Sequence, residues 1–191
     1  MESHVGVVPG HWSVYALLGW SAMDEVADGV RVAMRGDQNV LIQGPSGSGK
    51  TALAVALGHA LGRKGRVVRA TLGASDDLNT ITSELFGHER GAFSGAARRR
   101  VGLVEHADGG VLILDEVLNL PPHAQQLLLD FTQFGTYRPL GHDGPEPRRA
   151  DVRILGATQG DLMQAIEDGR FRRDLYYRLA GVPIRVPALR D

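Results

Sequence analysis

Eight consecutive residues of the chain, GPSGSGKT, have the types and spacing that cradle a phosphate group. They are Gly44, Pro45, Ser46, Gly47, Ser48, Gly49, Lys50 and Thr51. The glycines allow successive backbone N–H groups to turn towards an anion, and a helix that begins here directs its positive dipole end at the same place. In such a loop the lysine reaches the β- and γ-phosphates, and the threonine hydroxyl binds Mg²⁺. The segment therefore predicts a nucleoside triphosphate site.

The second group of residues that could do chemistry is the acid pair Asp115 and Glu116, which follows the apolar run VLIL. In an enzyme with a phosphate loop, the first carboxylate helps to hold Mg²⁺ and the second polarises the attacking water. An apolar run followed by two acids is also common where an ordinary strand ends at the surface. A position about 60 residues after the phosphate loop favours the catalytic interpretation.

The elements that must position these residues alternate between strand-like and helical patterns, which predicts an α/β fold with a mostly parallel sheet. We expect strands at residues 38–43, 66–71, 111–114, 152–157 and 182–186. We expect helices at residues 21–34, 52–61, 77–86, 98–107 and 124–134, the last after a start at Pro121 and Pro122. Two more short helices should lie between the last two strands, and residues 141–149 should form a polar loop.

Composition and charge exclude several classes of protein. With 191 residues, 43% of them hydrophobic, the chain is expected to form one domain with one sizeable core. A net charge of −1 gives no global attraction to nucleic acid or anionic lipid. No apolar stretch approaches the roughly 20 residues that span a bilayer, and no secretory signal is apparent. We therefore expect a cytoplasmic protein without a membrane partner, and no metal other than Mg²⁺.

Four further motifs occur in order: ELFGHERGAFSGA at 84–96, DGGVLILDE at 108–116, DVRILGATQGDL at 151–162 and GRFRRDLYYRLAGVPIRVPALR at 169–190. Together they resemble the AAA+ ATPases that activate bacterial transcription through sigma-54, the bacterial enhancer-binding proteins. The resemblance covers residues 18–191, after a tail at residues 1–17. It implies an AAA+ αβα core with a mostly parallel five-stranded sheet, which binds ATP with Mg²⁺ and hydrolyses it.

One segment could contact a partner. It comprises Gly91, Ala92, Phe93, Ser94, Gly95 and Ala96. The flanking glycines suggest a flexible loop that displays the aromatic ring of Phe93, although the ring could instead fold back onto the core. The resemblance implies that this loop contacts sigma-54, so that sigma-54 and RNA polymerase are the expected partners.

The resemblance also implies roles for three residues near the end of the chain. Arg172 and Arg178 correspond to arginine fingers that reach the nucleotide of the neighbouring subunit, and Gln159 corresponds to the first sensor of the γ-phosphate. A guanidinium suits a finger because it stays charged and offers bidentate donors. Taken alone, either arginine would more often belong to a solvated helix face. The fingers imply a homo-oligomeric ring, a hexamer when the protein is complete.

The chain departs from the family pattern at five places. Thr51 replaces a common glutamate, Ser94 a threonine, Gln159 an asparagine and Asn119 an acidic residue, while Thr71 and Leu72 occupy the place of a coupling asparagine. We expect these changes to affect coupling and turnover more than nucleotide binding. The family's helical lid and a helix-turn-helix are expected to be absent from this chain, which should not bind DNA directly.

These observations predict an ATP-hydrolysing core that remodels sigma-54 RNA polymerase to activate transcription. Two alternatives stay open at this point. The chain could be an AAA+ remodelling ATPase for another partner, or a truncated module that binds ATP with little turnover.

Overall fold

The computed structural model describes residues 24–73 and 78–188. A five-stranded sheet lies at its centre, with strand order β2-β3-β6-β1-β7. Its strands are β1 (Val40–Gln43), β2 (Val67–Thr71), β3 (Val111–Asp115), β6 (Arg153–Thr158) and β7 (Val182–Arg185). Every neighbouring pair is parallel. The predicted α/β fold with a parallel five-stranded sheet is confirmed.

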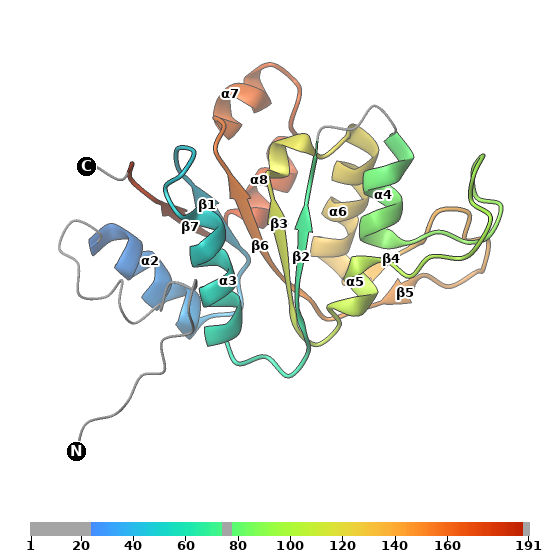
Figure 1. Ribbon diagram of the computed structural model, residues 1–191, viewed down its shortest axis with the longest axis horizontal. Helices are drawn as coiled ribbons and strands as arrows, with labels where there is room; N and C mark the ends of the chain where they lie inside the picture. The colour runs from blue at the N-terminus through green and yellow to red at the C-terminus, as the bar shows by residue number, and fades with distance from the viewer. Residues whose placement is uncertain (1–23, 74–77, 189–191) are drawn as a thin grey trace.

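Helices cover both faces of this sheet, so the molecule has three layers (Figure 1). One face carries α2 (Asp24–Arg35) and α3 (Lys50–Ala60). The other face carries α4 (Leu78–Phe86), α5 (Leu103–His106), α6 (Pro122–Phe134), α7 (Leu162–Glu167) and α8 (Arg173–Leu179). No helix within the described ranges is long and apolar enough to cross a membrane.

The sequence explains why the central strands are buried between two helical layers. Every residue of β3 and β6 is buried, as expected for strands that are covered on both faces. Helix α3 is apolar on most sides, and Gly58 lets it approach the sheet, because an added Cβ would lie 3.1 Å from Val67 Cγ1. The helix that begins at the phosphate loop is thus fixed against the strands that carry the acid pair.

Two predicted segments differ from the structure. The helix predicted at 98–107 is wrong at its start, since α5 covers only Leu103–His106. Arg100 instead forms an antiparallel bridge with His88. The predicted polar loop at 141–149 ends in β5 (Arg148–Arg149), which pairs with β4 (Thr136–Tyr137). Both differences arise from pairing between distant residues, which local periodicity does not report. The predicted helix starts at positions 21 and 77 lie outside the described residues.

Candidate nucleotide-binding site

The phosphate loop connects β1 to α3, and its glycines are needed for two different reasons. Gly47 and Gly49 have φ of 75° and 84°, in the left-handed region that favours glycine. At Gly44 the reason is space, since an added Cβ would lie 2.4 Å from the carbonyl oxygen of Val186. The loop therefore adopts a backbone that side chains would prevent, with Pro45, Ser46 and Gly47 exposed.

Two polar side chains of this loop fit a phosphate group. Lys50 is 6% exposed, and its Nζ donates to the carbonyl oxygen of Pro45 at 2.6 Å. Ser48 is 3% exposed, and its Oγ has no hydrogen-bond partner among the described residues. A buried hydroxyl without a partner is costly, so it marks a place where a ligand oxygen can be accepted. An ammonium and a hydroxyl beside a helix N-terminus are suitable donors for an anion.

The first acid of the pair lies beside the phosphate loop. Asp115 is the last residue of β3 and is 6% exposed. Its Oδ2 accepts a hydrogen bond from Thr51 Oγ1 at 3.0 Å. A hydroxyl and a carboxylate are hard oxygen ligands, the kind that Mg²⁺ prefers. The two residues predicted from the sequence to hold Mg²⁺ are therefore adjacent, and their donor set fits that ion.

A residue that the sequence analysis missed also contacts this acid. Arg69 in β2 donates from Nη2 to Asp115 Oδ2 at 2.7 Å. Arg69 lies two positions before the end of β2, and β2 pairs with β3, which carries Asp115. Only the strand order shows which acid this arginine meets.

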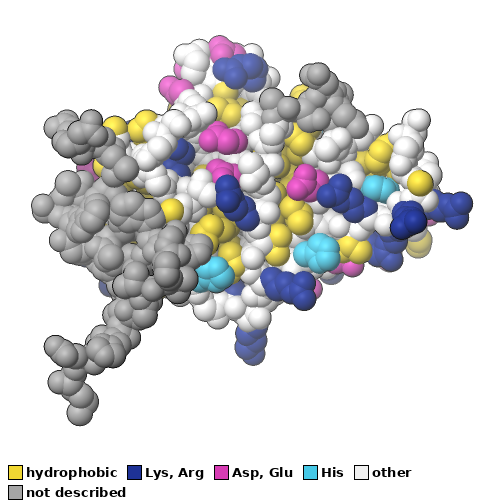
Figure 2. Space-filling model, viewed as in Figure 1, with side chains coloured by type: hydrophobic (Ala, Val, Ile, Leu, Met, Phe, Trp, Pro, Cys, Tyr) yellow, Lys and Arg dark blue, Asp and Glu magenta, His cyan; other side chains and the backbone are white. Residues whose placement is uncertain are grey.

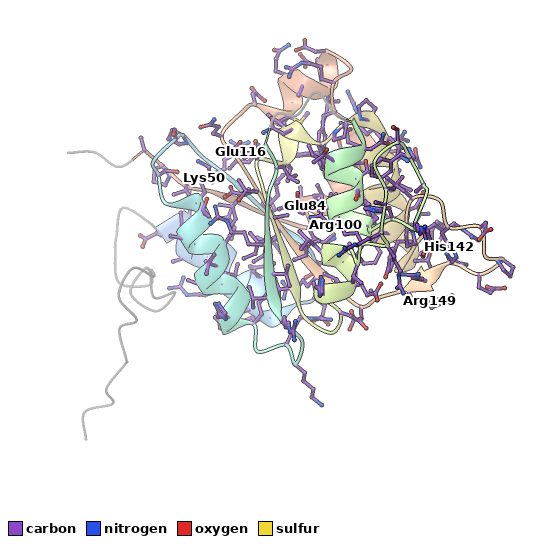
Figure 3. All side chains as sticks on the ribbon, turned by 45° about the vertical axis from the view of Figure 1, so that its right-hand side comes forward. Lys50, Glu84, Arg100, Glu116, His142 and Arg149 are labelled. Atoms are coloured by element: carbon purple, nitrogen blue, oxygen red, sulfur yellow. The ribbon has the colours of Figure 1, made fainter. Side chains whose placement is uncertain are left out.

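The second acid, Glu116, has an unusual backbone. Its φ is 61°, and it is the one non-glycine residue with positive φ in the part of the chain that the structure describes. A glutamate in the left-handed region is strained, and such strain is commonly kept at functional sites. The residue lies between β3 and the 3-10 turn η2 (Val117–Asn119), so the chain turns sharply here. Figure 3 shows Lys50 and Glu116 towards the same edge of the sheet.

Gln159 follows β6 and approaches Glu116 through its backbone. Its N–H donates to Glu116 Oε2 at 3.4 Å, and its side chain is exposed. Thr158, just before it, accepts at its carbonyl oxygen a bond of 3.3 Å from the N–H of Gly44. The end of β6 thus joins the acid pair to the first residue of the phosphate loop.

Thr71 and Leu72, at the end of β2 and just after it, occupy the place of the asparagine in the family pattern. Leu72 is 1% exposed, and its N–H donates to the carbonyl oxygen of Asp115 at 3.0 Å. Asn119 also bonds to Leu72, because its Nδ2 donates to the carbonyl oxygen of Leu72 at 2.5 Å. The position is fixed by backbone contacts, and Leu72 offers Glu116 no polar side chain.

The two predicted fingers lie at the two ends of α8, Arg172 just before its start and Arg178 in its last turn. Arg172 forms a bidentate pair with Asp174, at 3.0 Å from Nε to Oδ1 and 2.8 Å from Nη2 to Oδ2. This hydrogen bonding raises the pKa of Arg172 and lowers the pKa of Asp174. Arg178 lines a cavity of about 420 Å³ together with Asn39, which precedes β1. The phosphate loop follows β1, so Arg178 lies at the opposite end of that strand.

The predicted partner loop is a closed hairpin. At its base, the N–H of His88 donates to the carbonyl oxygen of Arg100 at 3.0 Å, and the reverse bond measures 2.9 Å. At its tip, Gly91 N–H donates to the carbonyl oxygen of Ala96 at 2.8 Å. The ring of Phe93 is partly buried and meets the ring of His88 edge to face, with centroids 5.0 Å apart. Phe93 therefore folds back onto the base of its own loop.

Charged residues tie this hairpin to the second one, β4–β5. Arg148 donates to Glu89 Oε1 at 2.7 Å and to Glu105 Oε2 at 3.0 Å. Tyr137 Oη donates to the same oxygen of Glu105 at 3.1 Å. Burial, followed by the charge of Glu105, raises the pKa of Tyr137 to about 12. In Figure 3, Arg100, His142 and Arg149 lie in this loop region, away from Lys50.

Comparison with known proteins assigns a family to this architecture. The model of the sigma-54 interaction domain matches residues 18–185. The DNA-binding transcriptional regulator NtrC of Rhizobium meliloti (strain 1021) is 47% identical over 173 residues, which are 90% of this chain and 35% of that protein. The nif-specific regulatory protein of Azotobacter vinelandii is 42% identical over 170 residues, 88% of this chain and 32% of that protein. This chain thus spans about a third of the length of these relatives.

A solved structure supports the same assignment. NtrX from Brucella abortus, in a crystal structure in complex with ATP, is similar with a TM-score of 0.75 and 33% identity, over 90% of this chain and 38% of that one. Sequence motifs, family model and fold agree over nearly the same residues. On these grounds, the chain belongs to the family of sigma-54 interaction domains.

Proposed function

We propose that this chain is the ATP-binding and ATP-hydrolysing core of a transcription activator that remodels sigma-54 RNA polymerase. The core would comprise residues 18–191, preceded by a tail at residues 1–17. The observation that carries the proposal is the hydrogen bond between Thr51 and Asp115, which joins the phosphate loop to the acid pair. A phosphate loop, a magnesium-type oxygen pair and a second acid beside them are the parts that phosphoryl transfer to water requires.

Each residue of the site then has a role. Thr51 and Asp115 would hold Mg²⁺, which would supply positive charge to offset the charge that develops on the phosphates. Lys50 would exchange the carbonyl oxygen of Pro45 for the terminal phosphates, and the Ser48 hydroxyl would find an acceptor there. Glu116 would orient and polarise the attacking water, and Gln159, next to it, would sense the γ-phosphate.

The fingers and the partner loop would work between molecules. Arg178 lies at the far end of β1 from the phosphate loop of its own chain, which supports a role towards the nucleotide of a neighbouring copy in a ring. Arg172 would have to leave Asp174 to do the same. The loop at 91–96 would contact sigma-54 through Phe93, once the ring leaves His88.

Two observations favour a second candidate, a module that binds ATP with little turnover. Arg172 already has a bidentate partner in its own chain, and Thr71 and the buried Leu72 occupy the place of a coupling asparagine. Both features reduce the groups available for hydrolysis without altering the phosphate loop.

Measured ATP binding and turnover test the proposal. We expect the protein to bind ATP in the presence of Mg²⁺, to release phosphate, and to retain sigma-54 on a column with a transition-state analogue of ATP. Phe93→Ala should keep ATP binding and lose sigma-54, which makes it the matched control. ATP binding without phosphate release, in a sample that sizing shows to be oligomeric, would support the low-turnover module instead. Turnover without retention of sigma-54 would point to another partner.

A further inference from the structure

The side chain of Arg69 lies on the carboxylate that the proposed function assigns to Mg²⁺. Its Nη2 is 2.7 Å from Asp115 Oδ2, and the same oxygen accepts the bond from Thr51 Oγ1 at 3.0 Å. The Asp115 side chain is 8% exposed, whereas that of Arg69 is 47% exposed. A half-exposed cation from the edge strand therefore neutralises a buried acid at the candidate nucleotide site.

The sheet register explains how Arg69 reaches this acid. In the β2–β3 pairing, Thr71 lies opposite Asp115 and Arg69 lies opposite Ile113. Ile113 packs in the cluster that includes α3, and side chains of paired residues share a face, so Arg69 lies on the α3 face of β2. Its long side chain then extends towards the end of the sheet. Figure 2 shows acidic and basic side chains close together on this face of the molecule.

This position conflicts with a bound metal ion. Mg²⁺ binds carboxylate oxygens at roughly 2.0–2.1 Å, so an ion held by Asp115 and Thr51 would lie close to the guanidinium on the same oxygen. A Mg²⁺ ion and the guanidinium of Arg69 on the same oxygen would repel each other. The repulsion is stronger in a site that is shielded from water, as it is around Asp115. Because the Arg69 side chain is half exposed, it can turn away from Asp115 into solvent.

We propose that Arg69 is an internal counter-ion that competes with Mg²⁺ for Asp115, so that loading of ATP with Mg²⁺ requires the guanidinium to leave the carboxylate. This inference rests on the proposed function, because it takes Thr51 and Asp115 as the residues that bind the metal. Arg69 then has two effects. It stabilises the protein before loading, and it raises the concentration of Mg²⁺ at which the nucleotide site fills.

The test is ATP binding by calorimetry over a range of free Mg²⁺, with Glu116→Gln in every variant to prevent turnover. Arg69→Gln should lower the Mg²⁺ concentration at half-maximal ATP affinity, the Mg²⁺ midpoint, by about two- to fivefold, the range expected for a partly exposed ion pair. Thermal unfolding gives a readout that does not involve nucleotide chemistry. Arg69→Gln should unfold at a lower temperature without ATP, and this difference should narrow with saturating Mg²⁺ and ATP.

Two controls separate this role from a general effect of charge. Arg63→Gln removes another arginine–aspartate pair, 2.6 Å from Arg63 Nη2 to Asp151 Oδ2, before the start of β6 at the opposite end of the sheet. It should leave the Mg²⁺ midpoint unchanged. In an Asp115→Asn background, Arg69→Gln should have no further effect, because its partner carboxylate is gone. If Arg69→Gln does not fold, Arg69→Lys should shift the midpoint in the same direction, by about twofold.

The outcomes distinguish this inference from the proposed function. An unchanged or raised Mg²⁺ midpoint in folded Arg69→Gln, with ATP binding intact, would overturn the counter-ion role alone. A shift of equal size in the Asp115→Asn background would overturn it as well, since Arg69 would then act elsewhere. Failure of the Glu116→Gln protein to bind ATP at any Mg²⁺ concentration would overturn the proposed function and this inference together.

Discussion

At the scale of single residues, the candidate site is built from side chains whose present partners differ from those that catalysis requires. Lys50 is bonded to a loop carbonyl, Asp115 to Arg69, and Arg172 to Asp174. For the buried Lys50 and Asp115, these bonds satisfy charged groups that would otherwise be costly to leave unpaired, whereas the Arg172–Asp174 pair is exposed to solvent. Binding of nucleotide must therefore break several of these bonds. The net free energy of binding is then the difference between the bonds formed with the nucleotide and the bonds lost.

The first prediction concerns Lys50. Lys50→Ala should weaken ATP binding by about tenfold to a hundredfold, because a charged hydrogen bond contributes about 1.5–3 kcal/mol. Lys64→Ala is the matched control, since Lys64 is exposed beyond the end of α3 and should leave the affinity unchanged. Calorimetry measures both. Equal affinity of folded Lys50→Ala and wild type would contradict the role of the phosphate loop.

The second prediction uses the strained backbone of Glu116. Glycine adopts φ of about 60° without penalty, whereas alanine at this position keeps the strain. Glu116→Gly should therefore be more stable than Glu116→Ala by about 1 kcal/mol, the reverse of their order in a helix. Chemical denaturation measures the difference. Both variants should bind ATP and hydrolyse it far more slowly than wild type, and greater stability of Glu116→Ala would show that the positive φ carries no strain.

At the scale of elements, the hairpin of β4 and β5 is joined to the loop at 88–100 by a partly buried network. Tyr137 is 5% exposed, and its hydroxyl and Arg148 meet at one oxygen of Glu105. Arg148 also holds Glu89, next to the base of the predicted partner loop. The two hairpins are thus expected to move together rather than independently.

The third prediction tests this network by pH. An unfolded tyrosine loses its proton near pH 10, but the pKa of Tyr137 in the fold is raised to about 12. Between pH 10 and about 12, the unfolded state binds fewer protons than the folded state. The free energy of unfolding should therefore fall as pH rises, by up to about 1.4 kcal/mol per pH unit. Denaturation at pH 8, 10 and 11 measures the loss. Tyr137→Phe should lack this part of the pH dependence, and identical slopes for the two proteins would contradict the raised pKa.

Local sequence patterns could predict the strands and the phosphate loop because those signals are contained in short runs. VLI before the loop and VLIL before the acid pair are apolar runs bounded by breakers, and both form strands. The bridge from His88 to Arg100, the β4–β5 pair and the contact of Arg69 with Asp115 could not be predicted in this way. Each depends on which segments become neighbours, and that is decided by the packing of the whole sheet.

At the scale of the whole molecule, the separation of Arg178 from the phosphate loop is the feature that concerns assembly. Arg178 lies beside Asn39, before β1, whereas Lys50 and Glu116 lie beyond the ends of β1 and β3. One copy of the chain does not bring Arg178 and the acid pair together. A ring, in which one copy presents Arg178 to the site of the next, would resolve this.

The fourth prediction tests that arrangement with two inactive variants. Glu116→Gln and Arg178→Ala should each hydrolyse ATP slowly, with a loss on the order of a thousandfold or more for the finger. Mixed at a concentration where sizing shows oligomers, they should regain measurable hydrolysis, because some sites combine an intact Glu116 with an intact Arg178 from the neighbour. Arg173→Ala is the matched control and should be active alone. Oligomers without recovered hydrolysis would count against fingers that act between subunits.

The position of β1 in the sheet also affects how the chain is made. Val40 pairs with Leu155 on one side and with Val182 on the other, so both neighbours of β1 are synthesised long after it. At 5–20 residues per second, the second neighbour leaves the ribosome on the order of ten seconds after β1. Until β6 emerges, the apolar strand and the phosphate loop have no neighbouring strand to join. We therefore expect the nucleotide site to form late in synthesis, after β6 and β7 have joined β1, so that a bound nucleotide would stabilise the finished sheet rather than guide its early folding.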